Sequence, residues 1–352
     1  MPNSENKRDV KKIVFFTLFL LLISLICYDV FSNYQALTDQ PLLASGSNPL
    51  ILEIKPETSA RTFVNRLYSQ KLVRSKHILL ALIRARGLSN HLQAGIYQVN
   101  PGESVVDLLA RVVKGDVLVE SFRILDGSTL VDLKQNLAQS PYLNSHNVDF
   151  STIAGQHLSA EGLLMADTYY YRAGSDASSL LKQANQNLLT YLDMAWQNRD
   201  PTLPYKNSYE LLIAASIIEK EASLPLERKI IAGIIVKRLK INMPLQMDPT
   251  VLYALANRAS STATQGATKR IILPLHHQDL KINSPYNTYL HRGLPPTPIA
   301  MVGKQSLDAA AHPDETNYLY FFAKGDGSHQ FSTNYQEQQQ AIQQFKLRAT
   351  TP

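Results

Sequence analysis

The segment ASIIEKEASLP at residues 215–225 places two carboxylates, Glu219 and Glu221, among apolar and small residues. Burial against such residues favours the protonated form of a carboxyl group, which can donate a proton. On a helix the two glutamates are about 200° apart, so they flank the apolar face on opposite sides and cannot act as a mutual pair. Small neighbours leave space for a ligand beside Glu219, whereas Glu221 has bulkier ones. Either Glu219 is a catalyst in a groove, or both are boundary residues with water-exposed carboxylates.

The sequence offers little support for other kinds of catalytic site. The nine histidines form no pair at metal-ligand spacing on one helix, so we expect no metal site. No G-x-S-x-G, P-loop or G-x-G-x-x-G motif occurs, which argues against a Ser/His/Asp hydrolase and against nucleotide binding. The carboxylates therefore remain the candidates, and no cofactor is expected.

The composition, with 45% hydrophobic and 18% charged residues, is typical of a folded protein. The formal net charge of +6 is spread along the chain, without an arginine- or lysine-rich helix or an alternation of basic and aromatic residues. We therefore expect no nucleic-acid partner. An anionic polymer or a membrane surface would suit a moderately basic protein.

The N-terminal segment is predicted to be a single-pass transmembrane anchor at 13–31. It is almost wholly apolar, and a helix of this length spans about 28 Å, close to the thickness of a hydrocarbon core. The basic residues before it predict a cytoplasmic tail at 1–12 and place the rest of the chain outside the cytoplasm. A cleaved signal peptide is the alternative, but no small-x-small cleavage site follows the apolar segment.

The periodicity of the remaining chain predicts an α+β protein in two parts. A polar linker at 32–49 is followed by a small α+β module at 50–117 and a larger α+β domain at 118–345. Helices are predicted at 57–72, 77–87, 105–115, 130–141, 177–197, 208–223, 227–240, 249–256 and near 304–311, and strands at 50–56, from 94, at 117–125, 318–325 and 329–333. The helix at 208–223, which carries both glutamates, is the most apolar one after the anchor.

Several motifs in the larger domain resemble those of one family when they are taken in order. They are EGLLMADTYYY (161–171), ASIIEKEA (215–222), MPLQMDPTVLY (243–253), SPYNTY (284–289), GLPPTPI (293–299), AAHPDETNYLYFFA (310–323) and GSHQF (327–331). Their order closely resembles that of the endolytic murein transglycosylases of the YceG-like family, over about 50–345. The membrane anchor and the small module before the catalytic part are similar to that family's layout.

The resemblance implies an endolytic lytic transglycosylase of peptidoglycan. Such an enzyme cleaves the β-1,4 bond between N-acetylmuramic acid (MurNAc) and N-acetylglucosamine (GlcNAc), and the muramyl C6 hydroxyl attacks in place of water, which leaves a 1,6-anhydro end. The motif places the catalytic glutamate at Glu219, and the module at 50–117 resembles a peptidoglycan-binding LysM-like domain. The family implies location at the cell inner membrane with a periplasmic catalytic domain, glycan strands as substrate and peptidoglycan synthases as partners.

Residues in two of these motifs are expected to line the substrate groove. They are Gln246, Asp248, Tyr286, Asn287 and Thr288. Each has a structural alternative, because Asp followed by Pro is a good helix N-cap, and Ser-Pro and Asn are common in turns.

Two other functions remain open from the sequence. A hydrolytic muramidase would need a second carboxylate besides Glu219, for which Asp167, Glu161 and Asp248 are candidates. A non-catalytic peptidoglycan-binding scaffold of the synthesis machinery would need none.

Overall fold

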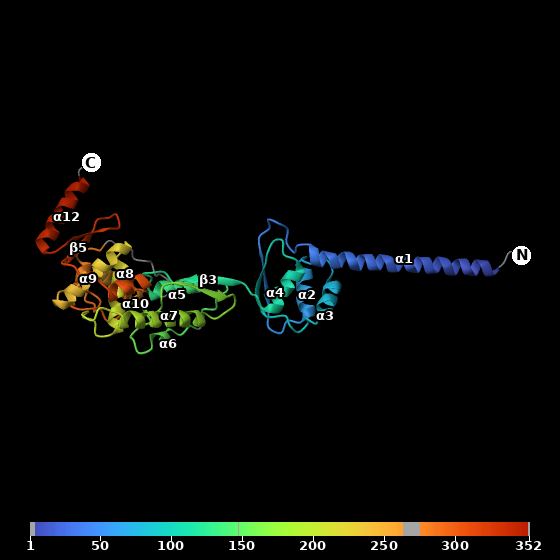
Figure 1. Ribbon diagram of the computed structural model, residues 1–352, viewed down its shortest axis with the longest axis horizontal. Coiled ribbons are helices and arrows are strands. Elements are labelled where there is room, and N and C mark those ends of the chain that lie inside the picture. The colour runs from blue at the N-terminus through green and yellow to red at the C-terminus, as the bar shows by residue number, and fades with distance from the viewer. Residues whose placement is uncertain (1–3, 147, 263–274, 351–352) are drawn as a thin grey trace. The chain divides into compact units, whose positions relative to one another are not determined.

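The structure, a computed structural model, describes residues 4–146, 148–262 and 275–350 (Figure 1). Residues 263–274, within the predicted catalytic domain, lie outside the described residues. Contacts divide the chain into two compact units, the first formed by residues 1–120 and 172–174 and the second by 121–171 and 175–352. The predicted boundary at 117–118 lies close to this division, and the functions assigned to the two parts remain predictions.

The first unit begins with one long helix, α1 (Ser4–Asp39). The described part of the chain has one helix long and apolar enough to cross a membrane, at Lys11–Asp39, and its apolar side chains from Ile13 to Phe31 are largely exposed. The helix does not end at residue 31 but continues into the segment predicted as a linker. Leu37 explains this continuation, because its side chain is only 4% exposed and packs into the core of the first unit.

The remainder of the first unit is a small α+β fold. Its elements are β1 (Leu50–Ile54), α2 (Ala60–Ser69), α3 (Lys76–Ala85), β2 (Gly95–Val99) and α4 (Val105–Lys114). The two strands pair antiparallel, and the core between them and the helices is built on buried residues such as Phe63, Leu79 and Tyr97. This agrees with the predicted α+β character, while the bounds of the module and its likeness to a LysM domain stay predictions.

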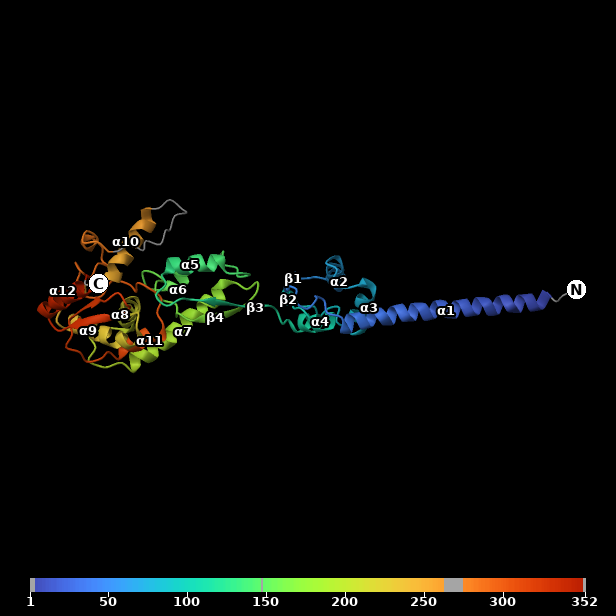
Figure 2. The same ribbon diagram turned by 90° about the horizontal axis from the view of Figure 1, so that it is seen from above.

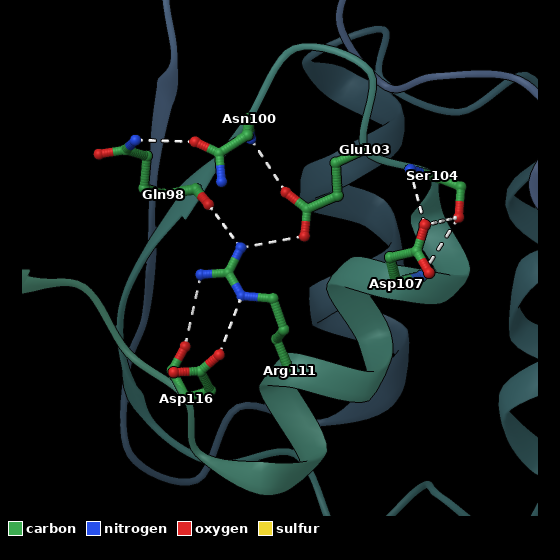
Figure 3. A network of polar contacts seen from close by, with 7 residues as sticks. All are labelled: Gln98, Asn100, Glu103, Ser104, Asp107, Arg111 and Asp116. Atoms are coloured by element: carbon green, nitrogen blue, oxygen red, sulfur yellow. Dashed lines mark hydrogen bonds and ion pairs between the residues drawn. The ribbon is translucent and has the colours of Figure 1, made fainter.

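Arg111 of α4 holds the polar side of this small fold together (Figure 3). Its guanidinium donates to Gln98 O and to the Glu103 carboxylate, both at 2.9 Å, and pairs with Asp116 at 3.3 Å. One planar side chain thereby joins β2, the turn before α4 and the segment after it, which suits the several fixed donors of arginine. These charged side chains therefore have a structural role in the small fold.

The second unit is a larger α+β fold. Figure 2 shows most of its elements from above. They are β3 (Val119–Arg123), α5 (Leu130–Gln139), α6 (Phe150–Ala154), β4 (Thr168–Arg172), α7 (Ala177–Gln197), α8 (Ser208–Glu221), α9 (Arg228–Lys240), α10 (Asp248–Thr262), α11 (Lys304–Ala311), β5 (Tyr320–Ala323), β6 (His329–Ser332) and α12 (Tyr335–Thr350), with short 3-10 turns at Pro225–Glu227 and Asp279–Lys281. The strands form two-stranded sheets, β3 with β4 and β5 with β6, and helices supply the rest of the fold.

Helix α8 lies at the centre of the second unit. It contacts α7, α9, α10 and α11, and every residue from Leu211 to Ile218 is buried. Asn207 begins the helix, because its side chain accepts a hydrogen bond from the amide of Glu210 at 3.0 Å. A helix buried on all sides forms a rigid base, and its first polar residues after the buried stretch are those of the Glu-Lys-Glu sequence.

Candidate active site

Glu219 lies in the last turn of α8, and its side chain is enclosed by the protein. Only 3% of the side chain is exposed. Its Oε1 accepts a hydrogen bond from Arg228 Nη2 at 3.0 Å, and its Oε2 accepts one from the amide of Gly303 at 3.1 Å. The interpretation of Glu219 as a boundary residue with a water-exposed carboxylate is therefore wrong. The carboxyl group is enclosed, and each of its oxygens has a donor.

Arg228 reaches Glu219 because the chain reverses between the two helices. The turn at Pro225–Glu227 leads directly into α9, whose first residue is Arg228. The guanidinium also donates to the side chain of Gln305, while its Nε is buried without a hydrogen-bond partner. A charge-assisted hydrogen bond of this kind holds the carboxyl group in a fixed position. The sequence did not predict this cation beside Glu219.

The turn that carries Arg228 is held by the last hairpin of the chain. Glu227 accepts hydrogen bonds from the amide of His329 at 2.9 Å and from its ring Nδ1 at 2.6 Å. His329 begins β6 and belongs to the GSHQF motif, for which the sequence suggested no role. Through Glu227, the hairpin of β5 and β6 fixes the residue next to Arg228.

Glu221 has the opposite surroundings to Glu219. Burial raises the pKa of its carboxyl group to about 8, with a further contribution from the negative charge of Asp248, while the Arg238 guanidinium lowers it. Asp248 itself accepts a hydrogen bond from the Tyr289 hydroxyl at 2.5 Å. Glu221 therefore keeps its proton at neutral pH, although only one residue separates it from Glu219.

A second buried carboxyl group, Glu161, supports an aromatic pair. It accepts hydrogen bonds from the amide of Leu130 at 2.8 Å and the hydroxyl of Tyr253 at 3.1 Å, and burial raises its pKa to about 7. The rings of Tyr253 and Tyr286 lie 4.9 Å apart, and the Tyr286 hydroxyl shares a hydrogen bond with Thr297 at 2.9 Å. Both oxygens of Glu161 are thus engaged with the protein.

The predicted substrate-binding residues fall into two groups. Gln246 and Asp248 are exposed and Tyr286 is partly buried, so these three can meet a ligand. Asn287 and Thr288 are buried: the Asn287 amide donates to the carbonyls of 280 and 282, and the Thr288 hydroxyl accepts from the amide of residue 247. The structure therefore places these last two side chains where they hold the backbone of the loop.

Two short stretches of backbone bring these residues into one part of the second unit. The amide of Gln246 donates to Thr288 O at 3.1 Å, which joins two of the predicted motifs. The segment 297–303 runs beside α8, because the amide of Ile299 donates to the Ser216 hydroxyl at 3.0 Å and that of Gly303 to Glu219. The GLPPTPI motif therefore leads from the Tyr286 hydroxyl toward the carboxyl group of Glu219.

Sequence reasoning missed Asp126 as a neighbour of Glu219. A Cβ atom built on Gly303 would lie 2.4 Å from Asp126 Oδ1 and 3.7 Å from Glu219 Oε2. The two carboxylate oxygens are therefore no more than about 6 Å apart, close enough for their charges to interact. The Asp-Gly-Ser turn signal at 126–128 could have suggested a tight loop, but nothing in the sequence indicated what it faces.

The described residues contain no group of three or more histidine, cysteine, aspartate or glutamate side chains that could hold a metal ion. The chemistry available at this site is that of a carboxyl group with a guanidinium, a backbone amide and a second carboxylate close by. Such a set can exchange a proton with a bound substrate and stabilise charge near it.

Known proteins are similar to this sequence over most of its length. The model of the YceG-like family matches residues 52–344. A relative from Bacillus subtilis (strain 168), named endolytic murein transglycosylase, is 29% identical over 334 residues, which cover 87% of each chain. A relative of the same name from Streptococcus pneumoniae (strain D39) is 24% identical over 358 residues, and the match covers 91% of this chain but 62% of the relative.

One solved structure is also similar. It is a YceG-like protein of Listeria monocytogenes, 24% identical, with a TM-score of 0.48 over 84% of this chain and 100% of that one. Because the family model matches most of the chain, motifs included, the protein belongs to the YceG-like family.

Proposed function

We propose that the protein is an endolytic murein transglycosylase that cuts the β-1,4 bond between MurNAc and GlcNAc within peptidoglycan strands and leaves 1,6-anhydro ends. The observation that carries the proposal is the enclosed carboxyl group of Glu219, which occupies the glutamate position of the family motif and has a donor on each oxygen. The relatives named endolytic murein transglycosylase support the same reaction class.

The reaction needs one group that first donates a proton and then accepts one. Protonated Glu219 would give its proton to the leaving oxygen of GlcNAc as the C1–O bond of MurNAc breaks. Its carboxylate would then take the proton of the muramyl C6 hydroxyl as that oxygen bonds to C1. Water takes no part, so a single acid–base group can serve both steps, and Glu221 on the other side of the helix is not required.

The contact with Arg228 must change during this cycle. Arg228 donates to Glu219 Oε1 and the Gly303 amide donates to Oε2, so neither oxygen is free to hold a proton for the leaving group. Binding of the glycan would therefore displace the Arg228 guanidinium from Glu219 Oε1. The side chain of Gln305 already accepts a hydrogen bond from Arg228. It would continue to bind the guanidinium after the guanidinium has moved away from Glu219.

The predicted groove residues take different parts in this proposal. Gln246, Asp248 and Tyr286 present side chains that can hydrogen-bond the hydroxyl and acetamido groups of the glycan. Asn287 and Thr288 would act from inside the loop, as positioning residues that hold Tyr286 and Gln246 in place.

A hydrolytic muramidase is the second candidate function. The position of Asp126 makes it a better second carboxylate than those considered from the sequence. Glu161 and Asp248 are hydrogen-bonded to tyrosine hydroxyls, and Asp167 accepts from the amide of Thr168. Asp126 lies within about 6 Å of Glu219, so it could act as the second carboxylate of a hydrolase. Reducing ends in the products would identify this reaction.

The test is product analysis by mass spectrometry after digestion of purified peptidoglycan. We expect the wild-type protein to release 1,6-anhydro-muropeptides, and Glu219→Gln to lower the rate by at least about 100-fold, because the proton donor is lost. Glu221→Gln is the paired variant and should keep most of the activity. A folded Glu219→Gln protein that digests peptidoglycan at the wild-type rate would contradict the proposal.

The same variant distinguishes the enzyme from a scaffold. If Glu219→Gln restores wild-type glycan strand length in cells that lack the protein, binding alone is enough and the catalytic proposal fails.

We further propose that α1 is a single-pass anchor with its basic end in the cytoplasm and the catalytic unit in the periplasm. The first unit would bind glycan as a LysM-like module, and peptidoglycan synthases would be partners.

A further inference from the structure

A second carboxylate approaches Glu219 from a distant part of the chain. Asp126 lies in the loop between β3 and α5, and this loop is fixed on both sides. The amide of Gly127 donates to Met301 O at 2.9 Å, and the amide of Met301 donates to Ser128 O at 2.7 Å. Lys220, the residue after Glu219, donates from Nζ to Gly127 O at 3.1 Å. The loop is therefore tied both to the 301–303 segment and to the end of α8.

Gly303 lies next to both the Asp126 and the Glu219 carboxylates. Its backbone has φ −89° and ψ 170°, which any residue can adopt, so the conformation does not require glycine. The space favours glycine, because a Cβ atom there would lie 2.4 Å from Asp126 Oδ1 and the Asp126 side chain would have to turn aside. The same residue donates its amide to Glu219 Oε2. Gly303 thus binds the Glu219 carboxylate with its amide. The Asp126 carboxylate occupies the space that a side chain at residue 303 would fill.

The two carboxylates differ in their access to solvent. Asp126 is exposed, whereas the Glu219 side chain is 3% exposed. The charged groups around the pair come from three elements: Arg228 at the start of α9 pairs with Glu219, Lys220 at the end of α8 bonds the Asp126 loop, and Glu227 beside Arg228 is bound to His329 of β6. A ligand that displaces Arg228 would leave the Asp126 carboxylate on the other side of Gly303 from Glu219.

We propose that Asp126 is a second catalytic carboxylate, which stabilises positive charge on the muramyl ring while Glu219 transfers the proton. This inference rests on the proposed transglycosylase function. When the C1–O bond breaks, the ring gains oxocarbenium-like charge, which an ionised carboxylate at close range stabilises. Asp126 stays ionised throughout and forms no bond, because the C6 hydroxyl supplies the electron pair and Glu219 takes its proton.

The stabilising effect depends on the negative charge of Asp126. It is lost in Asp126→Asn, which has nearly the same shape without the charge.

The experiment measures kcat and KM of the full-length protein in detergent on purified glycan strands, with product identification. We expect Asp126→Asn to lower kcat by about 100-fold with little change in KM, and the remaining product to carry anhydro ends. Asp126→Glu keeps the charge and should recover kcat to within about tenfold of wild type. Asp193→Asn, an exposed aspartate on α7, is the matched control and should behave as wild type.

Gly303→Ala tests the geometry separately. It should lower kcat in the wild-type background, because the new Cβ displaces the Asp126 carboxylate. In the Asp126→Ala background the colliding oxygen is gone, and Gly303→Ala should then cost little more. A loss of the same size in both backgrounds would mean that Gly303 acts only through Glu219, which contradicts the shared site.

Recovery of kcat in Asp126→Glu distinguishes a catalytic charge from a structural role. If Asp126→Asn keeps kcat within about twofold of wild type, or loses activity without recovery in Asp126→Glu, the inference is wrong although the proposed function stands.

Two results would separate the inference from the function it rests on. If the wild-type protein releases reducing ends and a glycosyl group is found on Asp126 by mass spectrometry, Asp126 is the nucleophile of a hydrolase and both proposals fail. If the wild-type protein cleaves no glycan at all, the proposed function fails on its own evidence, independently of any Asp126 variant.

Discussion

At the scale of single residues, the two glutamates of the Glu-Lys-Glu sequence differ in the charge that comes closest to each. Glu219 accepts hydrogen bonds from the guanidinium of Arg228 and from the backbone amide of Gly303. Glu221 lies among protein atoms with the negative charge of Asp248 nearby, and its pKa rises to about 8. The helical wheel predicted opposite sides of the helix for the two residues but could not predict the charge on either side.

Replacement of Glu221 by glutamine should change how stability depends on pH. Its pKa rises from an ordinary 4.5 to about 8 on folding, so the folded state keeps a proton that the unfolded state has lost. The contribution of Glu221 to the free energy of unfolding is greatest below pH 4.5. It falls as the pH rises from 4.5 to about 8 and does not change further above that. Glu221→Gln should therefore be more stable than wild type at pH 8 and nearly equal at pH 4.5.

The measurement is urea unfolding of the full-length protein in detergent at both pH values. Glu161, whose pKa rises to about 7, acts in the same direction, so the variant should keep a weaker pH dependence and not lose it. A variant with an unchanged pH dependence would show that Glu221 is ionised in the folded protein at pH 8, against the expected effect of its burial.

At the scale of elements, the last part of the chain depends on a close approach to α9. The segment after α11 packs across this helix: the amide of Asp314 donates to Lys229 O at 3.0 Å, and Lys237 Nζ donates to Thr316 O at 3.2 Å. Gly233 allows the approach, because a Cβ atom there would lie 2.3 Å from Asp314 O. The hairpin of β5 and β6, which holds Glu227, follows this segment directly.

Gly233→Ala sets two effects against each other. Alanine in a helix interior is favoured over glycine by about 1 kcal/mol, whereas overpacking against backbone costs about 1–3 kcal/mol. Because the colliding atom belongs to the backbone and cannot turn aside, we expect the variant to be less stable by about 1 kcal/mol or more. Hydrogen exchange should show reduced protection in β5 and β6. Increased stability without loss of protection would show that the segment moves freely.

The elements themselves were largely predictable. The helix predicted at 177–197 is α7 (Ala177–Gln197), and the helices at 130–141 and 227–240 differ from the structure only at their ends. These are amphipathic or apolar stretches with capping residues, so local sequence is enough. Strand β4 was missed because Thr168–Arg172 is defined by pairing with β3, a contact between distant residues.

At the scale of the whole molecule, each unit has a core of its own, and α1 contributes to the first. Deletion of residues 1–31 removes the exposed apolar stretch but keeps Leu37, which packs into that core. We expect the shortened protein to leave the membrane fraction and to unfold at a temperature close to that of the full-length one. Fractionation by ultracentrifugation and a thermal unfolding curve are the measurements.

Deletion of residues 1–39 is the control, because it also removes Leu37 and should lower the stability of the first unit. A protein without residues 1–31 that stays in the membrane fraction after a high-salt wash would show that another part of the chain binds the membrane. The apolar stretch would then not be the sole anchor.

The sequence by itself determined the apolar N-terminal helix, the α+β character, the helix that carries Glu219 and the family to which the chain belongs. These properties depend on local periodicity and on the order of motifs, which a sequence states directly. The tertiary structure alone decided what surrounds Glu219. Gly303 is 84 residues away and Asp126 lies in another loop, and electrostatic effects depend on distance in space. Which charged groups surround Glu219 is therefore a property of the folded protein.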